Sequence, residues 1–179
     1  GFVENCAKHL AELTGKKIVP ATDLIAATSD LSGFVNYSSA LNTLAVRLSK
    51  IASDLILLAS GPRTALFEIN LPPLQPGSSI MPGKVNPVLP ELVNLVTFRV
   101  MGNDVAVTIA AKTGQLQLNA YEPLAISAIL ESQKLLTNTM KAFKTKCVDG
   151  ITANEDVMTK YINQSVGIVT ALNPVLGYE

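Results

Sequence analysis

Apolar residues recur with the spacing of an α-helix over most of this chain, most regularly between residues 30 and 60. There they occupy two positions of a seven-residue repeat: Phe34, Leu41, Leu48 and Leu55, with Tyr37, Leu44, Ile51 and Leu58 three residues after each. Such a repeat predicts a long helix that packs against other helices. Further apolar positions widen this face, so we expect more than one neighbour. Gly61 and Pro62 end the helix.

The remaining pattern is also helical, and no segment alternates between apolar and polar residues as a strand would. Further helices are predicted at residues 2–14, from about 22, at about 87–112 and 122–146, at 154–164 with Asn154 as the cap, and at 165–172. The helix at 87–112 is apolar on nearly every side, which indicates a central position. The predicted fold is all-α, a bundle of long antiparallel helices.

The chain carries little charge. It has 14 Lys and Arg residues and 14 Asp and Glu residues, a net charge of +0. This balance argues against a nucleic-acid partner or an acidic membrane surface. Charged residues make up 16% of the chain, below the usual share of about 25%. We therefore expect other domains or subunits to cover some of the helices.

The two cysteines, Cys6 and Cys147, show neither metal-ligand spacing nor a disulfide pattern, so we expect reduced thiols in a cytoplasmic protein. No uninterrupted apolar run approaches the roughly 18 residues that a transmembrane helix needs, so no membrane is expected. The chain starts at Gly1 and ends at Glu179 without a polar tail. We expect it to be a piece of a longer protein.

Residues 77–87 form the stretch with the clearest candidate chemistry. Glycines and prolines shape it as a loop, and Pro87 marks the start of the helix that follows. A helix N-terminus attracts anions, Lys84 adds a full charge, and the Asn86 amide can donate to a carboxylate. With Ser78 and Ser79 nearby, the loop suits a small anion and a hydroxyl that acts on it. Spacing alone leaves open that the loop only connects two helices.

The loop reads Gly-Ser-Ser-x-Met-Pro-x-Lys-x-Asn-Pro, and in this it resembles the signature of the fumarase/aspartase superfamily of lyases. Three further runs are similar to the family: residues 60–63, 102–104 and 170–174. The resemblance extends over essentially the whole chain. It implies that residues 1–179 are the central helical-bundle domain, and that the N-terminal and C-terminal domains of the parent protein lie outside this chain.

Two branches of the family fit unequally. Residues 88–91 (Val-Leu-Pro-Glu), 114–119 (Gly-Gln-Leu-Gln-Leu-Asn) and 122–123 (Glu-Pro) are more similar to the aspartase branch, the aspartate ammonia-lyases, than to the fumarases. That branch implies elimination of ammonia from L-aspartate to give fumarate. The alternatives are hydration of fumarate to malate and a non-catalytic helical scaffold.

The resemblance also implies roles for individual residues. It assigns Ser78 as the general base and Glu91 as a glutamate that pairs with an upstream histidine; the substrate-binding positions are Ser79, Lys84, Val85 and Asn86. The chain's one histidine, His9, is expected on the surface and is not that partner. The family further implies a homotetramer whose active sites each gather residues from three subunits, so the isolated chain is expected to be inactive. No metal ligand and no required cofactor are expected, and activation by a divalent cation such as Mg²⁺ stays open.

Overall fold

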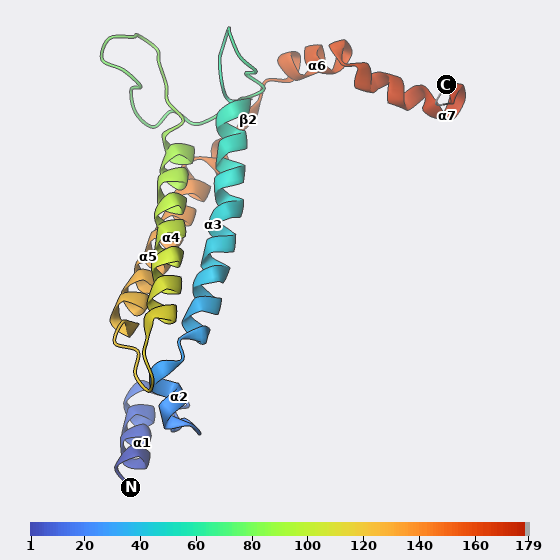
Figure 1. Cartoon of the computed structure of the whole chain (residues 1–179). Coiled ribbons are helices and arrows are strands. Elements are labelled where there is room, and N and C mark those ends of the chain that lie inside the picture. The colour runs from blue at the N-terminus through green and yellow to red at the C-terminus, as the bar shows by residue number, and fades with distance from the viewer. Residues whose placement is uncertain (178–179) are drawn as a thin grey trace.

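The computed structural model describes residues 1–177, which are mostly helical (Figure 1). Three long helices form its body: α3 (Ser32–Leu58), α4 (Val88–Thr113) and α5 (Glu122–Lys146). The shorter elements are α1 (Phe2–Thr14), α2 (Leu24–Ser29), β1 (Ile69–Asn70), η1 (Val148–Gly150), β2 (Thr152–Ala153), α6 (Glu155–Gln164), η2 (Val166–Leu172) and α7 (Asn173–Leu176).

Helices α3, α4 and α5 lie beside one another and alternate in direction (Figure 1). Hydrogen bonds between α3 and α4 show the antiparallel register. Near the start of α3, the Ser38 hydroxyl donates to Asp104 at 2.6 Å; further along, the Ser49 hydroxyl donates to Asn94 at 2.8 Å. Residue numbers therefore rise on α3 as they fall on α4. The predicted bundle of long antiparallel helices is confirmed.

Helix α4 is the central helix, as its apolar sequence predicts. It packs on both α3 and α5 through three clusters of buried apolar side chains along its length, which include Val93, Val100 and Val107. Each buried side chain of this size stabilises the fold by roughly 1.5–3 kcal/mol. On α3 the facing residues Ala45 and Ala52 are 0% exposed. Their small side chains leave room for the two helices to approach closely.

The predicted helix boundaries agree closely with the structure, and α5 begins and ends at the expected residues. Three details were wrong. Strands β1 and β2 pair antiparallel, although each has only two residues. The Asn154 side chain does not cap α6, because its oxygen accepts from the Asn70 amide at 2.6 Å and its amide donates to the carbonyl of Phe67 at 2.9 Å. Residues 166–172 form a 3₁₀ helix, and the chain stays helical beyond the predicted end at residue 172, because α7 begins at Asn173.

A polar contact joins α4 to α5 inside the bundle. The buried Asn103 amide donates to Glu131 at 2.8 Å and to Ser132 at 3.0 Å, and Arg99 pairs with the same Glu131 carboxylate at 2.9 Å. The hydrogen bond from Asn103 and the contact with Arg99 hold the pKa of Glu131 below its usual value.

The free thiol of Cys147 is buried in the apolar core, and this burial raises its pKa.

By length and composition alone, α4 is also a candidate membrane span, with a mean hydropathy of 1.3 over 18 residues. Asn94, Arg99 and Asp104 interrupt its apolar residues, so it contains no uninterrupted apolar run of the length that a membrane span needs. In the structure each of these polar side chains bonds to a neighbouring helix. This is how the central helix of a bundle satisfies its polar groups.

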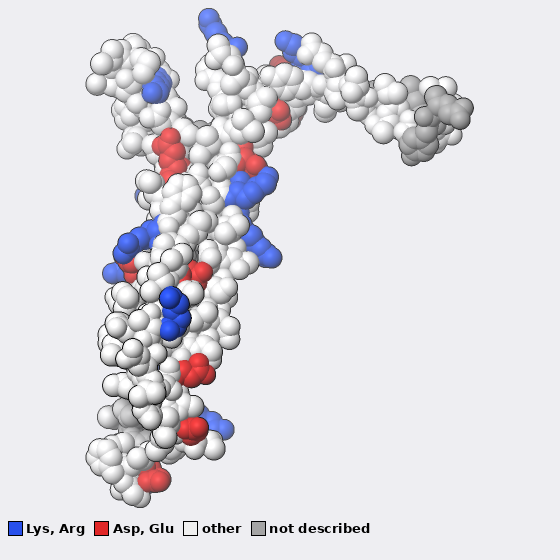
Figure 2. Space-filling view, viewed as in Figure 1, with Lys and Arg blue, Asp and Glu red and all other residues white. Residues whose placement is uncertain are grey.

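Many apolar side chains remain outside the core. The view in Figure 2 shows a surface with few charged groups along the three long helices. The exposed apolar residues on α4 are Leu92, Leu95, Phe98, Val105 and Ile109. Helices α1 and α2 lie at one end of the bundle, whereas α6, η2 and α7 form an arm at the other, next to the loops that precede α4 (Figure 1).

Candidate active site

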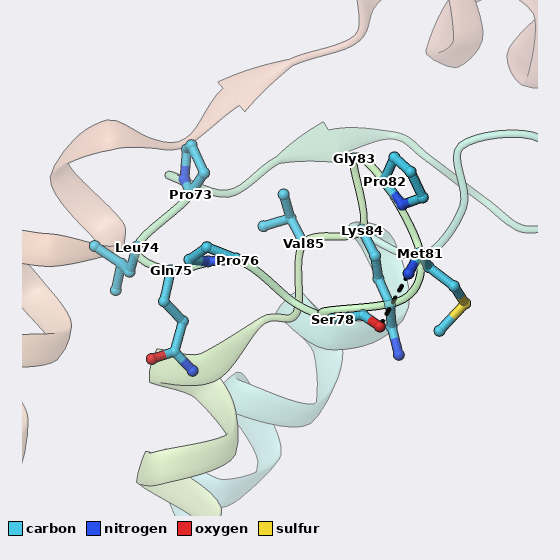
Figure 3. A pocket seen from close by; sticks show the side chains of 10 residues that line it. All are labelled: Pro73, Leu74, Gln75, Pro76, Ser78, Met81, Pro82, Gly83, Lys84 and Val85. Carbon is cyan, nitrogen blue, oxygen red and sulfur yellow. Dashed lines mark hydrogen bonds between the residues drawn. The ribbon is translucent and has the colours of Figure 1, made fainter.

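The loop of residues 77–87 lies at the end of the bundle where α4 begins. Together with the preceding connector it forms an open pocket of about 430 Å³ (Figure 3). The lining residues are Pro73, Leu74, Gln75, Pro76, Ser78, Met81, Pro82, Gly83, Lys84 and Val85. Three prolines restrict the backbone around this pocket. Gly83 has a φ of 77°, which reverses the chain at the tip of the loop.

Ser78 is half-buried at the start of the loop. Its hydroxyl oxygen accepts hydrogen bonds from the backbone N–H groups of Ile80 at 3.1 Å and Met81 at 3.2 Å. The dashed line in Figure 3 marks the second of these bonds. Both donors carry partial positive charge, so they favour a negatively charged oxygen over a neutral hydroxyl. These two donors would therefore stabilise an alkoxide at Ser78.

Lys84 lies on the returning side of the loop and lines the same pocket as Ser78. In Figure 3 the side chains of Lys84 and Val85 leave the backbone in opposite directions, with that of Lys84 on the side of Ser78. Lys84 and Ser79 are exposed, and the Val85 side chain is 51% exposed. A charged ammonium in an open pocket suits an incoming carboxylate.

Three of the expected site residues, Ser79, Asn86 and Glu91, lie outside the pocket lining. Asn86 is half-buried, and its amide donates to the backbone carbonyl of Gly77 at 3.2 Å. Glu91 is exposed in the first turn of α4, where its backbone N–H donates to the carbonyl of Pro87 at 3.1 Å. The structure thus brings Ser78, Lys84 and Val85 to one pocket and leaves Glu91 at the helix beside it.

His9 behaves as expected of a surface residue. Its side chain is 73% exposed and lies 3.3 Å from the Glu12 carboxylate on α1. Helix α1 is at the opposite end of the bundle from the loop (Figure 1). Within residues 1–177, His, Cys, Asp and Glu side chains form no group of three or more that suits a metal ion.

Sequence reasoning missed two features of the site. The connector residues 73–76 line the pocket, although they precede the loop motif and were not expected in the site. Gly77 makes close contacts with the returning side of the loop, although the sequence predicted only that glycines shape the loop. Its position at the very start of the loop motif was the signal for a structural requirement there.

Comparison with known proteins agrees with this fold and loop. The sequence profile of a family described as Lyase matches residues 1–102. The chain belongs to this lyase family. The aspartate ammonia-lyase of Pseudomonas aeruginosa is 54% identical over 179 residues, which are 100% of this chain and 38% of that protein.

Two solved structures show the same arrangement of helices. A protein described as fumarate lyase:delta crystallin from Brucella melitensis is 50% identical, with a TM-score of 0.92 over 99% of this chain and 41% of that one. A class II fumarase from Schistosoma mansoni is 35% identical, with a TM-score of 0.92 over 99% of this chain and 40% of that one. The resemblance to the fumarase/aspartase superfamily is confirmed. The chain spans less than half the length of each of these relatives.

Proposed function

We propose that the full-length protein is an aspartate ammonia-lyase, which eliminates ammonia from L-aspartate to give fumarate. The observation that carries this proposal is the Ser78 hydroxyl oxygen, which accepts two backbone N–H groups in a pocket that Lys84 also lines. Elimination starts with removal of a proton from a carbon beside a carboxylate. Such a carbon acid is weak, so the reaction needs a positioned base and stabilisation of the extra negative charge.

In this proposal Ser78 is the base and removes the proton as an alkoxide. The N–H groups of Ile80 and Met81 stabilise the alkoxide before the reaction. When the proton moves to Ser78, the electron pair passes into the adjacent carboxylate, and it then forms the double bond as ammonia leaves. Lys84 supplies positive charge for the carboxylates, and Ser79, Val85 and Asn86 contact the substrate. Interactions that strengthen as charge develops are the ones that accelerate the reaction.

Glu91 is proposed to act beside this pocket as the partner of a histidine outside this chain. Its place in the first turn of α4 is favourable for a carboxylate in any case, because the helix N-terminus carries partial positive charge. The reaction as written uses acid–base chemistry alone, so we propose that no cofactor is required. Assays with added Mg²⁺ and with a chelator test whether a divalent cation activates the enzyme.

The choice of L-aspartate over fumarate as the substrate is supported by two observations. The sequences at residues 88–91 and 114–119 are similar to the aspartase branch. The identity to an aspartate ammonia-lyase is 54%, against 35% to a class II fumarase. Hydration of fumarate is the second candidate, because that fumarase shares the fold with a TM-score of 0.92. A non-catalytic scaffold is disfavoured by the intact Ser78, Lys84 and Asn86.

We propose further that the protein is a homotetramer in which three subunits contribute to each active site. The exposed apolar side chains on the long helices support association, since a single chain leaves them in water. The pocket is open to solvent in the single chain, and this supports a shared site, because residues of other subunits can approach it.

The experiment that tests the function follows the ultraviolet absorbance of fumarate formed from L-aspartate by the full-length protein. A parallel assay starts from fumarate in water without ammonia. If the protein forms malate from fumarate faster than it forms fumarate from L-aspartate, it belongs to the fumarase branch. No reaction in either assay, from a folded tetramer, would support the scaffold.

A further inference from the structure

The loop that carries Ser78 closes on itself at a neck, which we define as Gly77, Lys84 and Asn86. The Gly77 N–H donates to the Lys84 carbonyl at 2.7 Å. The Gly77 carbonyl accepts from the Asn86 side-chain amide at 3.2 Å. Both backbone polar groups of Gly77 are therefore bound to the returning side of the loop.

The neck admits only glycine at position 77. A Cβ built there would lie 2.5 Å from the Lys84 carbonyl oxygen, 2.8 Å from its carbon and 3.1 Å from the Asn86 nitrogen. All three are backbone atoms, so they cannot turn aside as the end of a flexible side chain can. The glycine is required by close approach of two backbone segments. Any larger residue must open the neck.

The neck acts on Ser78 through a single peptide unit. The Gly77 carbonyl that Asn86 holds belongs to the Gly77–Ser78 peptide, which is planar. Fixing this plane restricts the direction in which the Ser78 side chain leaves the backbone. The bonds from Ile80 and Met81 then complete the placement of the hydroxyl. Without the neck, those two bonds alone would hold Ser78 to the tip of a loose loop.

We propose that Gly77 and Asn86 are positioning residues, which hold the Ser78 hydroxyl at the pocket through the neck. This inference rests on the proposed function and adds to it, because Gly77 needs no contact with substrate. Asn86 uses one amide hydrogen on the Gly77 carbonyl, and its second hydrogen and its oxygen remain available to a substrate. Asn86 thereby links the bound anion to the placement of the base.

Gly77→Ala is the direct test in the full-length enzyme, because it opens the neck and changes no polar group. We expect kcat to fall by about 10- to 100-fold, since a displacement of about 1 Å costs that much in a positioned reaction. The dissociation constant of succinate, an unreactive dicarboxylate, should rise by a smaller factor than kcat falls, because Lys84 and Asn86 keep the groups that bind carboxylates. Gly33→Ala is the matched control, because a Cβ at exposed Gly33 meets no atom within 4 Å.

The double variant Gly77→Ala/Asn86→Ala separates positioning from independent contacts. If both residues act on kcat through one neck, the double variant should lose little more kcat than the worse single variant. The separate contact of Asn86 with the substrate should appear in KM. If their kcat losses multiply, or if Gly77→Ala keeps normal kcat, the proposal is wrong.

A second readout needs no activity. Trypsin cleaves after the exposed Lys84 when the loop opens, so Asn86→Ala should speed that cut severalfold relative to wild type. If trypsin cleaves Asn86→Ala after Lys84 no faster than it cleaves the wild type, the proposed role of the neck is wrong. This test does not depend on whether Gly77→Ala folds. A wild-type enzyme inactive on L-aspartate would instead sink the proposed function and leave the trypsin comparison to decide the neck.

Discussion

The hydroxyl oxygen of Ser78 accepts a hydrogen bond from the backbone N–H of Met81, 3.2 Å away. A hydroxyl that only caps a turn makes the same bond, so the bond alone does not define a base. The distinction comes from the surroundings, because Ser78 also accepts from Ile80 and lines an open pocket with Lys84. Mutation distinguishes the two roles, because loss of a serine base lowers kcat, whereas loss of a serine that only caps a turn does not remove the group that takes the proton.

Ser78→Ala in the full-length enzyme should lower kcat by about 10²–10⁴, the usual effect of removing a general base. KM should change much less, because Lys84 and Asn86 still hold the carboxylates. Ser79→Ala is the matched control: it makes the same change one residue later, at an exposed hydroxyl. Steady-state kinetics on L-aspartate should show the loss of kcat in Ser78→Ala and a smaller effect, mainly on KM, in Ser79→Ala. Near-normal turnover by Ser78→Ala would mean that another group is the base.

Lys84→Ala should weaken both substrate binding and turnover. Its charge stabilises the bound dicarboxylate, and it stabilises the more highly charged intermediate further, so kcat and affinity should both fall. Lys112→Ala is the control, because it removes an exposed lysine at the other end of α4. Kinetics and succinate titration on both variants test this. A Lys84→Ala enzyme with unchanged succinate affinity would contradict a carboxylate-binding role.

Phe98→Glu should disrupt the proposed tetramer. The Phe98 side chain on α4 is 58% exposed in the single chain. If another subunit covers it, a carboxylate there is removed from water without a partner, which is strongly unfavourable. Sedimentation velocity should show smaller species for this variant. Lys141→Glu, which places the same charge at an already polar exposed position on α5, should sediment as the wild type does. Equal sedimentation of Phe98→Glu and wild type would place that face outside any interface.

Glu131 should make folding stability depend on pH. Its pKa is lowered in the folded protein by the hydrogen bond from Asn103 and by Arg99. Its contribution is therefore present above the unfolded-state pKa and is lost as the pH falls through the folded-state value. Urea unfolding should show wild type more stable than Glu131→Gln near neutral pH, with the difference shrinking on acidification. Arg99→Gln should reduce the same dependence. A difference that grows at low pH would have the wrong sign.

The helices could be predicted because their signals are local. The seven-residue repeat of α3 and the apolar sequence of α4 predicted long packed helices, and α5 begins beside Pro123, as expected of that residue. The repeat did not identify the most buried residues of α3, which are Ser38, Ala45 and Ala52, and its members Tyr37 and Ile51 are exposed. Strands β1 and β2 could not be predicted, since two-residue strands more than 80 positions apart leave no period in the sequence. Asn154 is a good cap by residue type, yet its side chain instead forms hydrogen bonds with Phe67 and Asn70, which are also more than 80 residues away in the sequence.

The site was predictable in composition but not in geometry. The loop motif identified Ser78 and Lys84, and the structure brings them to one pocket. The neck was hidden because its bond between Gly77 and Lys84 joins two backbone groups, which every residue except proline carries. The glycine at position 77 was the one sequence signal of the neck, because it has no side chain to obstruct the close approach of the two backbone segments.

The most direct measurement of the central claim is the rate of fumarate formation from L-aspartate by the full-length enzyme and by its Ser78→Ala variant, compared at equal concentrations of folded tetramer. We predict rapid fumarate formation by the wild type, a slower rate of malate formation from fumarate, and a loss of about 10²–10⁴ in kcat for the variant. A wild type that hydrates fumarate faster than it deaminates L-aspartate, or a Ser78→Ala variant that retains wild-type turnover, would contradict the central claim.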